Sequence, residues 1–462
     1  MFPKLLENLN SFASRLAKAS LIQRCASRRG VVTLFLLFYT ICTLGILARY
    51  EFNPSALVRF GHYYVEQNQD ITPEGAIRLT GNEAHGGNGY DGQIFYYYAR
   101  TLFQPDVWPA GFSLAYRAPR AGYPLLAAPF AVLGDWGVVF GLYFAQIALM
   151  LASLVCIHAL LPVDRKWAAI FYALSPFAFM AFSLLVSDSI MIGLAFVGYY
   201  FYLRSDPERH SSEPGVVASF AQPGARAAAL VFAGLCFSMA IFAKESALFF
   251  LFPLGLHALW RRRIGRAAFM IAILAPVFAW QLYLREAHGM VPAEVLSIFL
   301  APLDGVFGVA RETLRLLGAF IEQPGGAALV ALIKHGAKIL LVAVLAAGIA
   351  LPFTGAWRKQ SFVPLRLGIL LTALHIIIAD WFYFWGIFDN VGRMFTMFVP
   401  LVVLLKGEDR SAKTAPFFFF VGVLSAFILV RAVFLTPAFD YDVFTPYQGP
   451  DYEQAPVGPG GG

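Results

Sequence analysis

The sequence predicts an all-α polytopic membrane protein with about eleven transmembrane helices and further interfacial helices in two long outer loops. Hydrophobic residues make up 59% of the 462 residues and charged residues only 14%, against roughly 25% in soluble domains. Apolar runs recur from residue 31 to residue 435, and basic residues gather in alternate segments between them. A soluble globular protein is therefore excluded.

The individual spans follow from the apolar runs, because a transmembrane helix needs roughly 20 consecutive apolar residues. The expected spans are residues 31–49, 136–162, 167–186, 188–204, 227–243, 246–260, 267–284, 339–355, 364–380, 393–406 and 415–435.

The distribution of charge predicts how these spans are oriented. With a cytoplasmic N-terminus, the cytoplasmic segments are 1–30, 163–166, 204–226, 261–266, 356–366 and 406–413. They hold 21 of the 35 Lys and Arg residues but only seven of the 28 acidic residues. Since basic residues are retained on the cytoplasmic side, we expect a multi-pass protein of the inner (cytoplasmic) membrane. The basic run at 261–266 adjoins an apolar stretch, so its expected partners are membrane lipids and not nucleic acid.

This threading divides the chain into three regions: a cytoplasmic N-terminal segment (1–30), a transmembrane domain (31–435) and a tail (436–462). The tail is rich in Pro, Gly and Tyr, and we expect it to be flexible and extracytoplasmic. Two outer loops, at about 50–135 and 285–338, are long. Apolar periodicity predicts interfacial helices at 54–67, 94–103 and 306–321 within them. The polar chemistry is therefore expected on the outer face.

The most informative stretch is GNEAHGGNGYDGQIFYYYAR, residues 81–100. Its glycines, Gly89 and Gly92 among them, permit an irregular backbone just before an aromatic helix. This arrangement puts Asp91 near the N-terminus of that helix, which keeps a carboxylate ionised, as a general base requires. The alternative is that Asp91 is only an N-cap or Asx-turn residue.

Two arginines follow in YRAPRAGYPLL, residues 116–126. Arg117 and Arg120 can clamp a phosphate through their forked donors. They can equally reach toward lipid head groups as interfacial residues.

Further polar clusters lie at the expected outer ends of spans, where ionisable residues are costly and often functional. They include Asp188, the neighbours Lys244 and Glu245, and Asp389 with Arg393. The alternative is a purely structural role: Lys244 and Glu245 can pair with each other in a turn, and Asp389 and Arg393 can form an i,i+4 pair on a helix. His375, inside an apolar run, is interpreted as a hydrogen-bonded core histidine.

The run GYDGQIFYYYA, followed by YRAPRAGYPLL and later by AKESALFFLFPL, resembles bacterial membrane proteins of cell-surface glycopolymer formation. The overall layout, from the first span to about residue 435, resembles the GT-C membrane glycosyltransferases, which use polyprenyl-phosphate-linked sugars. In that family an acidic residue of the first outer loop, beside an interfacial helix, is the catalytic base, so the resemblance implies this role for Asp91. The loop lacks the paired acids or DxD form of several GT-C branches, and no metal or other cofactor is expected.

The residues fit such a reaction, because a polyprenyl-phosphate donor needs cations at its phosphate and the acceptor hydroxyl needs one base. Asp91 is the expected base, and Arg117, Arg120, Lys244 and Arg393 are the expected phosphate ligands. Secondary acidic candidates are Asp188, Glu245 and Asp389, and substrate-wall candidates are Tyr90, Gln93, Tyr96 and Tyr97.

The predicted function is therefore that of an inverting glycosyltransferase acting on a glycan, lipid or protein acceptor at the outer face. The main alternative is a transporter or flippase for a lipid-linked or anionic solute, in which the same arginines bind the solute. A non-catalytic scaffold in an envelope-polymer complex is a third hypothesis.

Overall fold

The computed structural model describes residues 20–81, 87–104, 107–206, 222–290, 302–355 and 363–446. Within these ranges the protein is a helical membrane protein with only three short strands. Seven of its helices are long and apolar enough to cross a membrane. They are Arg28–Tyr50, Asp135–Leu160, Pro223–Ala243, Ile264–His288, Gly326–Phe353, Phe388–Glu408 and Ala415–Leu435.

These seven helices correspond to predicted spans, but four other predicted spans do not qualify. The continuous helix expected at 167–186 is wrong: Pro176 cannot continue a helix, and the segment is divided into α9 (Ala169–Ala173) and α10 (Pro176–Ser183). The predicted spans at 188–204, 246–260 and 364–380 correspond to α11 (Ser187–Arg204), α14 (Leu248–Trp260) and α19 (Val363–Ile377). Of these, α14 and α19 are short for a complete crossing, and α11 is mostly buried inside the protein.

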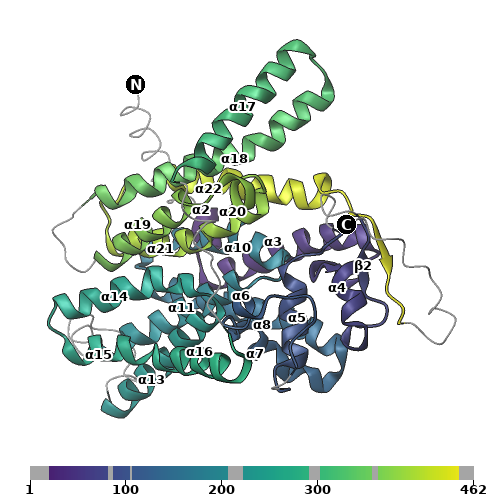
Figure 1. Cartoon of the computed structure of the whole chain (residues 1–462). Coiled ribbons are helices and arrows are strands. Elements are labelled where there is room, and N and C mark those ends of the chain that lie inside the picture. Colours follow the sequence, from purple (N-terminus) through teal and green to yellow (C-terminus); the bar gives the residue numbers. More distant parts are fainter. Residues whose placement is uncertain are drawn as a thin grey trace.

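Figure 1 shows two layers of helices. One contains α8 (Asp135–Leu160), α11, α13 (Pro223–Ala243), α14, α15 (Ile264–Ala272) and α16 (Ala275–His288). The other contains α18 (Gly326–Ala350), α19, α20 (Phe388–Met394), α21 (Phe398–Glu408) and α22 (Ala415–Val430). The layers meet where α14 packs on α19, while α11 packs against α8 and α13. Helices α2 (Ser20–Cys25) and α3 (Arg28–Leu47) begin the described chain.

The first long loop forms a compact group of short helices and strands between α3 and α8. The helix predicted over 54–67 is wrong: this segment contains a 3₁₀ turn (Pro54–Leu57), the strand β1 (Phe60–Gly61) and α4 (His62–Gln67). Arg59 interrupts it with a left-handed backbone (φ 57°). The helix predicted over 94–103 is confirmed as α5 (Asp91–Thr101), followed by α6 (Leu114–Arg117) and α7 (Gly122–Ala127).

The chain after residue 435 also contains ordered structure, contrary to the expectation of a wholly flexible tail. Strand β3 (Tyr441–Val443) pairs antiparallel with β2 (Ile77–Leu79), which pairs in parallel with β1. Arg78 and Asp442 face each other in this register and form an ion pair at 2.6 Å. Cross-strand pairing of this kind attaches the tail to the first loop.

The second long loop contains the predicted helix at 306–321, which is confirmed as part of α17 (Asp304–Glu322). The predicted span at 339–355 begins too late, because α18 extends back to Gly326. Together α17 and the start of α18 form a hairpin that projects from the rest of the protein in Figure 1.

Segments assigned to the cytoplasm contact one another in pairs at the end of the helices remote from the first loop. Arg165 donates a hydrogen bond to the carbonyl of Gly407 at 2.6 Å. Arg263 pairs with Asp206 at 2.7 Å, and the buried Arg366 pairs with Asp409 at 2.7 Å. The segments that were assigned to the cytoplasm from their Lys and Arg content are therefore neighbours in space. The side of the membrane on which they lie stays a prediction.

Candidate functional site

Asp91 is the first residue of α5, and two arginines hold its carboxylate. Arg117 approaches one oxygen at 2.6 Å and Arg393 approaches the other at 3.1 Å. The N-cap residue is Tyr90, and no side chain caps this helix. The alternative interpretation of Asp91 as a capping residue is therefore wrong.

Gly92 explains how Asp91 reaches this position. A Cβ atom at residue 92 would lie 2.8 Å from the carbonyl oxygens of both Val58 and Leu184. Only glycine therefore allows the start of α5 to pack directly against the first loop and the end of α10. The glycine-rich approach to α5 fixes the carboxylate against the membrane helices.

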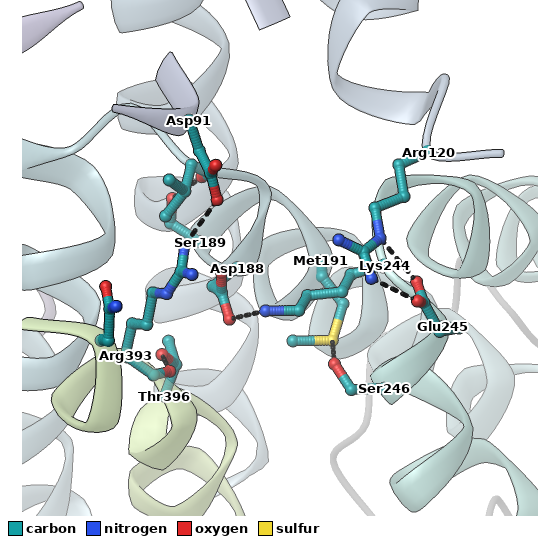
Figure 2. A network of polar contacts seen from close by, with 12 residues as sticks. Asp91, Arg120, Asp188, Ser189, Met191, Lys244, Glu245, Ser246, Arg393 and Thr396 are labelled. Atoms are coloured by element: carbon teal, nitrogen blue, oxygen red, sulfur yellow. Dashed lines mark hydrogen bonds and ion pairs between the residues drawn. The ribbon is translucent and has the colours of Figure 1, made fainter. Parts of the chain in front are cut away.

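Two further ion pairs lie beside Asp91, as Figure 2 shows. Arg120 binds Glu245 through two hydrogen bonds, of 3.0 and 2.5 Å. Lys244, which follows the last residue of α13, binds Asp188 in the first turn of α11 at 2.6 Å. The predicted pairing of Lys244 with Glu245 is wrong, because each contacts a residue from elsewhere in the chain.

The charged groups meet in one cavity of about 820 Å³, a volume within the range of ligand pockets. Seven predicted site residues line it: Asp91, Arg117, Arg120, Asp188, Lys244, Glu245 and Arg393. The remaining wall is largely apolar and comes from α14, from α16 and from the chain on either side of the π-helical turn η12 (Trp381–Trp385). Its apolar members include Leu248, Phe249, Val277, Phe278, Ile378 and Phe384.

The electrostatics of Asp91 are set by its two arginines. Burial disfavours the charged form, but the positive charges and hydrogen bonds of Arg117 and Arg393 outweigh this and hold the pKa of Asp91 well below its usual range. The carboxylate is ionised at neutral pH. Because both oxygens accept hydrogen bonds from guanidinium groups, the carboxylate is a weak base in this arrangement.

Asp389 lies outside the cavity. It binds Arg431 through both carboxylate oxygens, one of them at 2.9 Å. The predicted i,i+4 pair with Arg393 is wrong, because α20 directs Arg393 to Asp91 and Asp389 to another part of the protein.

The four substrate-wall candidates do not line the cavity either. Tyr96 donates a hydrogen bond to the carbonyl of Ile71 at 2.9 Å, and the hydroxyls of Tyr97 and Thr72 are 2.8 Å apart. Their aromatic rings are buried in the core of the first loop.

Gln93 and Tyr90 also hold this loop together. Gln93 accepts a hydrogen bond from the backbone N–H of Gly61 at 2.8 Å. The hydroxyl of Tyr90 donates to the side chain of Asn390. The four candidates thus position the start of α5, and their expected role as a wall is not supported by their packing.

Three cavity residues were missed or misinterpreted from sequence. The ring centroid of Tyr116 lies 4.5 Å and 4.7 Å from the guanidinium carbons of Arg117 and Arg120. Its position next to Arg117 in the YRAPR run could have predicted that it lies in the same site. His375 lines the cavity beside the ring of Phe249, a position that its interpretation as a core histidine did not predict. Gln281 has no sequence signal, because a single polar residue within the apolar run 267–284 does not indicate which helices face it.

Within the described ranges, no group of three or more His, Cys, Asp or Glu side chains is placed to hold a metal ion. The residues 82–86, which include three of the polar neighbours of Asp91, lie outside these ranges. No protein-family model matches this sequence, and no curated protein matches it either.

Proposed function

We propose that this protein transfers a sugar from a polyprenyl-phosphate donor to a hydroxyl acceptor at the outer face of the inner membrane. The observation that supports this most is the cavity itself, which joins four cationic and three acidic side chains to a long apolar wall. A lipid-phosphate-linked sugar has the same division into a polar, anionic head and an apolar chain.

The charge of the cavity suits one anionic group. Its four cations, Arg117, Arg120, Lys244 and Arg393, exceed its three carboxylates by one. Each carboxylate is paired with a cation, so these pairs nearly cancel one another's charge. A donor phosphodiester carries a single negative charge, which the excess cation balances, and the departing phosphate monoester is stabilised by forked guanidinium donors.

The apolar wall supports a lipid carrier over a soluble nucleotide donor. Val277 and Phe278 of α16 and Phe249 of α14 face the cavity. Phe278 is also 62% exposed, and Phe252 of α14 is 61% exposed, as expected for helices that contact lipid. A prenyl chain can therefore run from the cavity to the bilayer along one continuous apolar surface.

In the proposed reaction the acceptor oxygen attacks the anomeric carbon, the bond from that carbon to the phosphate oxygen breaks, and its electron pair stays on the phosphate. Asp91 takes the acceptor proton. The donor phosphate competes with Asp91 for Arg117 and Arg393, which adjoin it from two sides. As these guanidinium groups turn toward the phosphate, the pKa of Asp91 rises toward its ordinary value and the carboxylate becomes a better base.

The test uses the purified full chain in proteoliposomes with radiolabelled polyprenyl-phosphate hexoses and a membrane-glycan extract as acceptor. Label transferred to the acceptor supports the proposal, provided that Arg117→Ala lowers the transfer strongly and Arg315→Ala does not. Arg315 is exposed on α17, where it pairs with Glu312 outside the cavity. Movement of the intact donor between leaflets without transfer would instead support the flippase hypothesis.

A further inference from the structure

A second, smaller cavity of about 40 Å³ lies where the ends of α3 and α22 meet the first loop. It shares none of its lining residues with the large cavity. Its charged and polar members are Arg49, Arg59, Ser183, Asp389, Arg431 and Thr436. It is a separate polar site beside the one already described.

Positive charge predominates in this small cavity. Three guanidinium groups, from Arg49, Arg59 and Arg431, face one carboxylate, that of Asp389. Both oxygens of Asp389 are bound by Arg431. Arg49 is directed to backbone carbonyls, among them that of Ala432 at 2.7 Å. Among the described residues that line the cavity, the three guanidinium groups therefore exceed the carboxylates by two positive charges.

Arg59 differs from Arg431 in that it forms no direct ion pair with a described carboxylate, although the charge of Asp389 lies close enough to interact with it. Among the described residues its guanidinium makes no ion pair, and it lies over the rings of Tyr90 and Phe439 at 5.7 and 5.5 Å. Ring faces support a cation from the side but do not occupy its forked N–H donors. Those donors are available to an oxyanion.

The backbone holds Arg59 in place at a conformational cost. Its φ of 57° lies in the left-handed region, which side-chain-bearing residues rarely adopt. Its carbonyl accepts a hydrogen bond from the N–H of Tyr90 at 3.0 Å. Gly89, at φ 71°, passes so close that a Cβ atom there would lie 2.3 Å from this carbonyl. Arg59 is thus fixed to the same turn that begins α5.

The size of the cavity limits what can bind. Since one buried water needs about 10–15 Å³ of such space, 40 Å³ gives room for roughly three water-sized positions. This space matches a single tetrahedral oxyanion better than it matches a sugar ring.

We propose that Arg59 and Arg431, assisted by Arg49, form a second anion-binding site that takes one phosphate group. The site is independent of the sugar-transfer function proposed above, because it uses other residues. Tyr90 connects the two sites: Arg59 lies over its ring from the small cavity, and Arg393 lies over it at 5.4 Å from the large one.

The phosphate can belong to an anionic phospholipid head group or to a soluble molecule, and chemical modification distinguishes the two. The full chain, in nanodiscs of phosphatidylcholine alone, is treated with phenylglyoxal, and modification of Arg59 is followed by peptide mass spectrometry. Inorganic phosphate, against chloride of equal ionic strength, should slow modification of Arg59 about 10-fold or more, as expected for charge-assisted forked binding. The exposed Arg315 should be unaffected.

The same measurement in nanodiscs containing phosphatidylglycerol identifies the source. Protection of Arg59 without added phosphate assigns the site to a lipid head group, and protection by inorganic phosphate alone assigns it to a soluble phosphate. Asp389→Asn, which removes the competing carboxylate, should lower the half-protecting phosphate concentration several-fold. Equal modification of Arg59 in phosphate, chloride and both lipid compositions would overturn the proposal, whatever the outcome of the transfer assay.

Discussion

Replacing Asp91 by asparagine separates its proposed role as a base from a purely structural role. Asparagine keeps the shape of the side chain and one oxygen acceptor, but it cannot take up the acceptor proton. We expect transfer to fall by roughly 10²–10⁴-fold, the usual contribution of a general base. Because the variant no longer competes for Arg117 and Arg393, donor binding should be unchanged or several-fold tighter.

The cost in stability follows from the two contacts that are lost or weakened. A charge-assisted hydrogen bond contributes about 1.5–3 kcal/mol, and the amide can still accept one of the two bonds, so a destabilisation of about 1–3 kcal/mol is expected. The side chains of Asp91, Arg117 and Arg393 are only 22%, 20% and 14% exposed, so screening by water reduces this figure little.

The assay compares Asp91→Asn with Asp409→Asn, which removes a carboxylate from the buried pair with Arg366 far from the cavity. Both variants should lose thermal stability, but only Asp91→Asn should lose transfer at full occupancy by the donor. Near-normal turnover in folded Asp91→Asn would refute the assignment and move the role to Asp188 or Glu245, the other acids of the cavity.

Other predictions follow from the same contacts. Arg117→Ala and Arg120→Ala should each weaken donor binding about 10–100-fold as well as slow transfer; binding titrations that show loss of rate alone would count against phosphate contact. Since the pKa of Asp91 lies below its ordinary value, kcat/KM should not fall at acid pH through protonation of this group until the pH is below about 4. In Arg117→Gln this fall in kcat/KM should move to higher pH. A fall near neutral pH in the wild type that Asp91→Asn abolishes would contradict this expectation. The Cβ atom of Gly92→Ala would lie 2.8 Å from two carbonyl oxygens, so this variant should lower the free energy of unfolding by about 1–3 kcal/mol and reduce transfer. An unchanged melting temperature and an unchanged transfer rate would show that α5 can shift freely. A reporter fused after Leu435 should be active only outside the cytoplasm, and a cytoplasmic signal would reject the proposed threading.

Much of the site was predictable because its residues interrupt apolar sequence. In a chain with so few charges, carboxylates and guanidinium groups in the first loop and at the ends of spans are easily recognised, and seven such residues line one cavity. The helix that begins at Asp91 was also predictable, because glycines precede it and an aromatic-rich run follows. Local sequence carries both signals.

Pairing was not predictable, because it depends on how distant segments meet. Lys244 and Glu245 are adjacent, yet one binds Asp188 and the other Arg120. The backbone between them is extended at Lys244 (φ −163°, ψ 129°), which directs neighbouring side chains to different sides. Apolar length also misled the span assignment at 167–186, since a largely buried pair of short helices is as apolar as a lipid-facing one.

The pairing also changes how the individual roles are understood. From sequence, Asp91 is a base and the arginines are phosphate ligands, as if each acted alone. In the folded protein Arg117 and Arg393 both pair with Asp91, so the proposed base is held as a stabilised carboxylate. Since four cations without counterions would be costly in a partly buried cavity, the acids are needed for stability before substrate arrives. Under the proposed function, a donor phosphate that binds Arg117 and Arg393 would weaken their ion pairs with Asp91 and so raise the basicity of this carboxylate. We therefore expect donor affinity and basicity at Asp91 to be coupled, and a substitution at either arginine should change both.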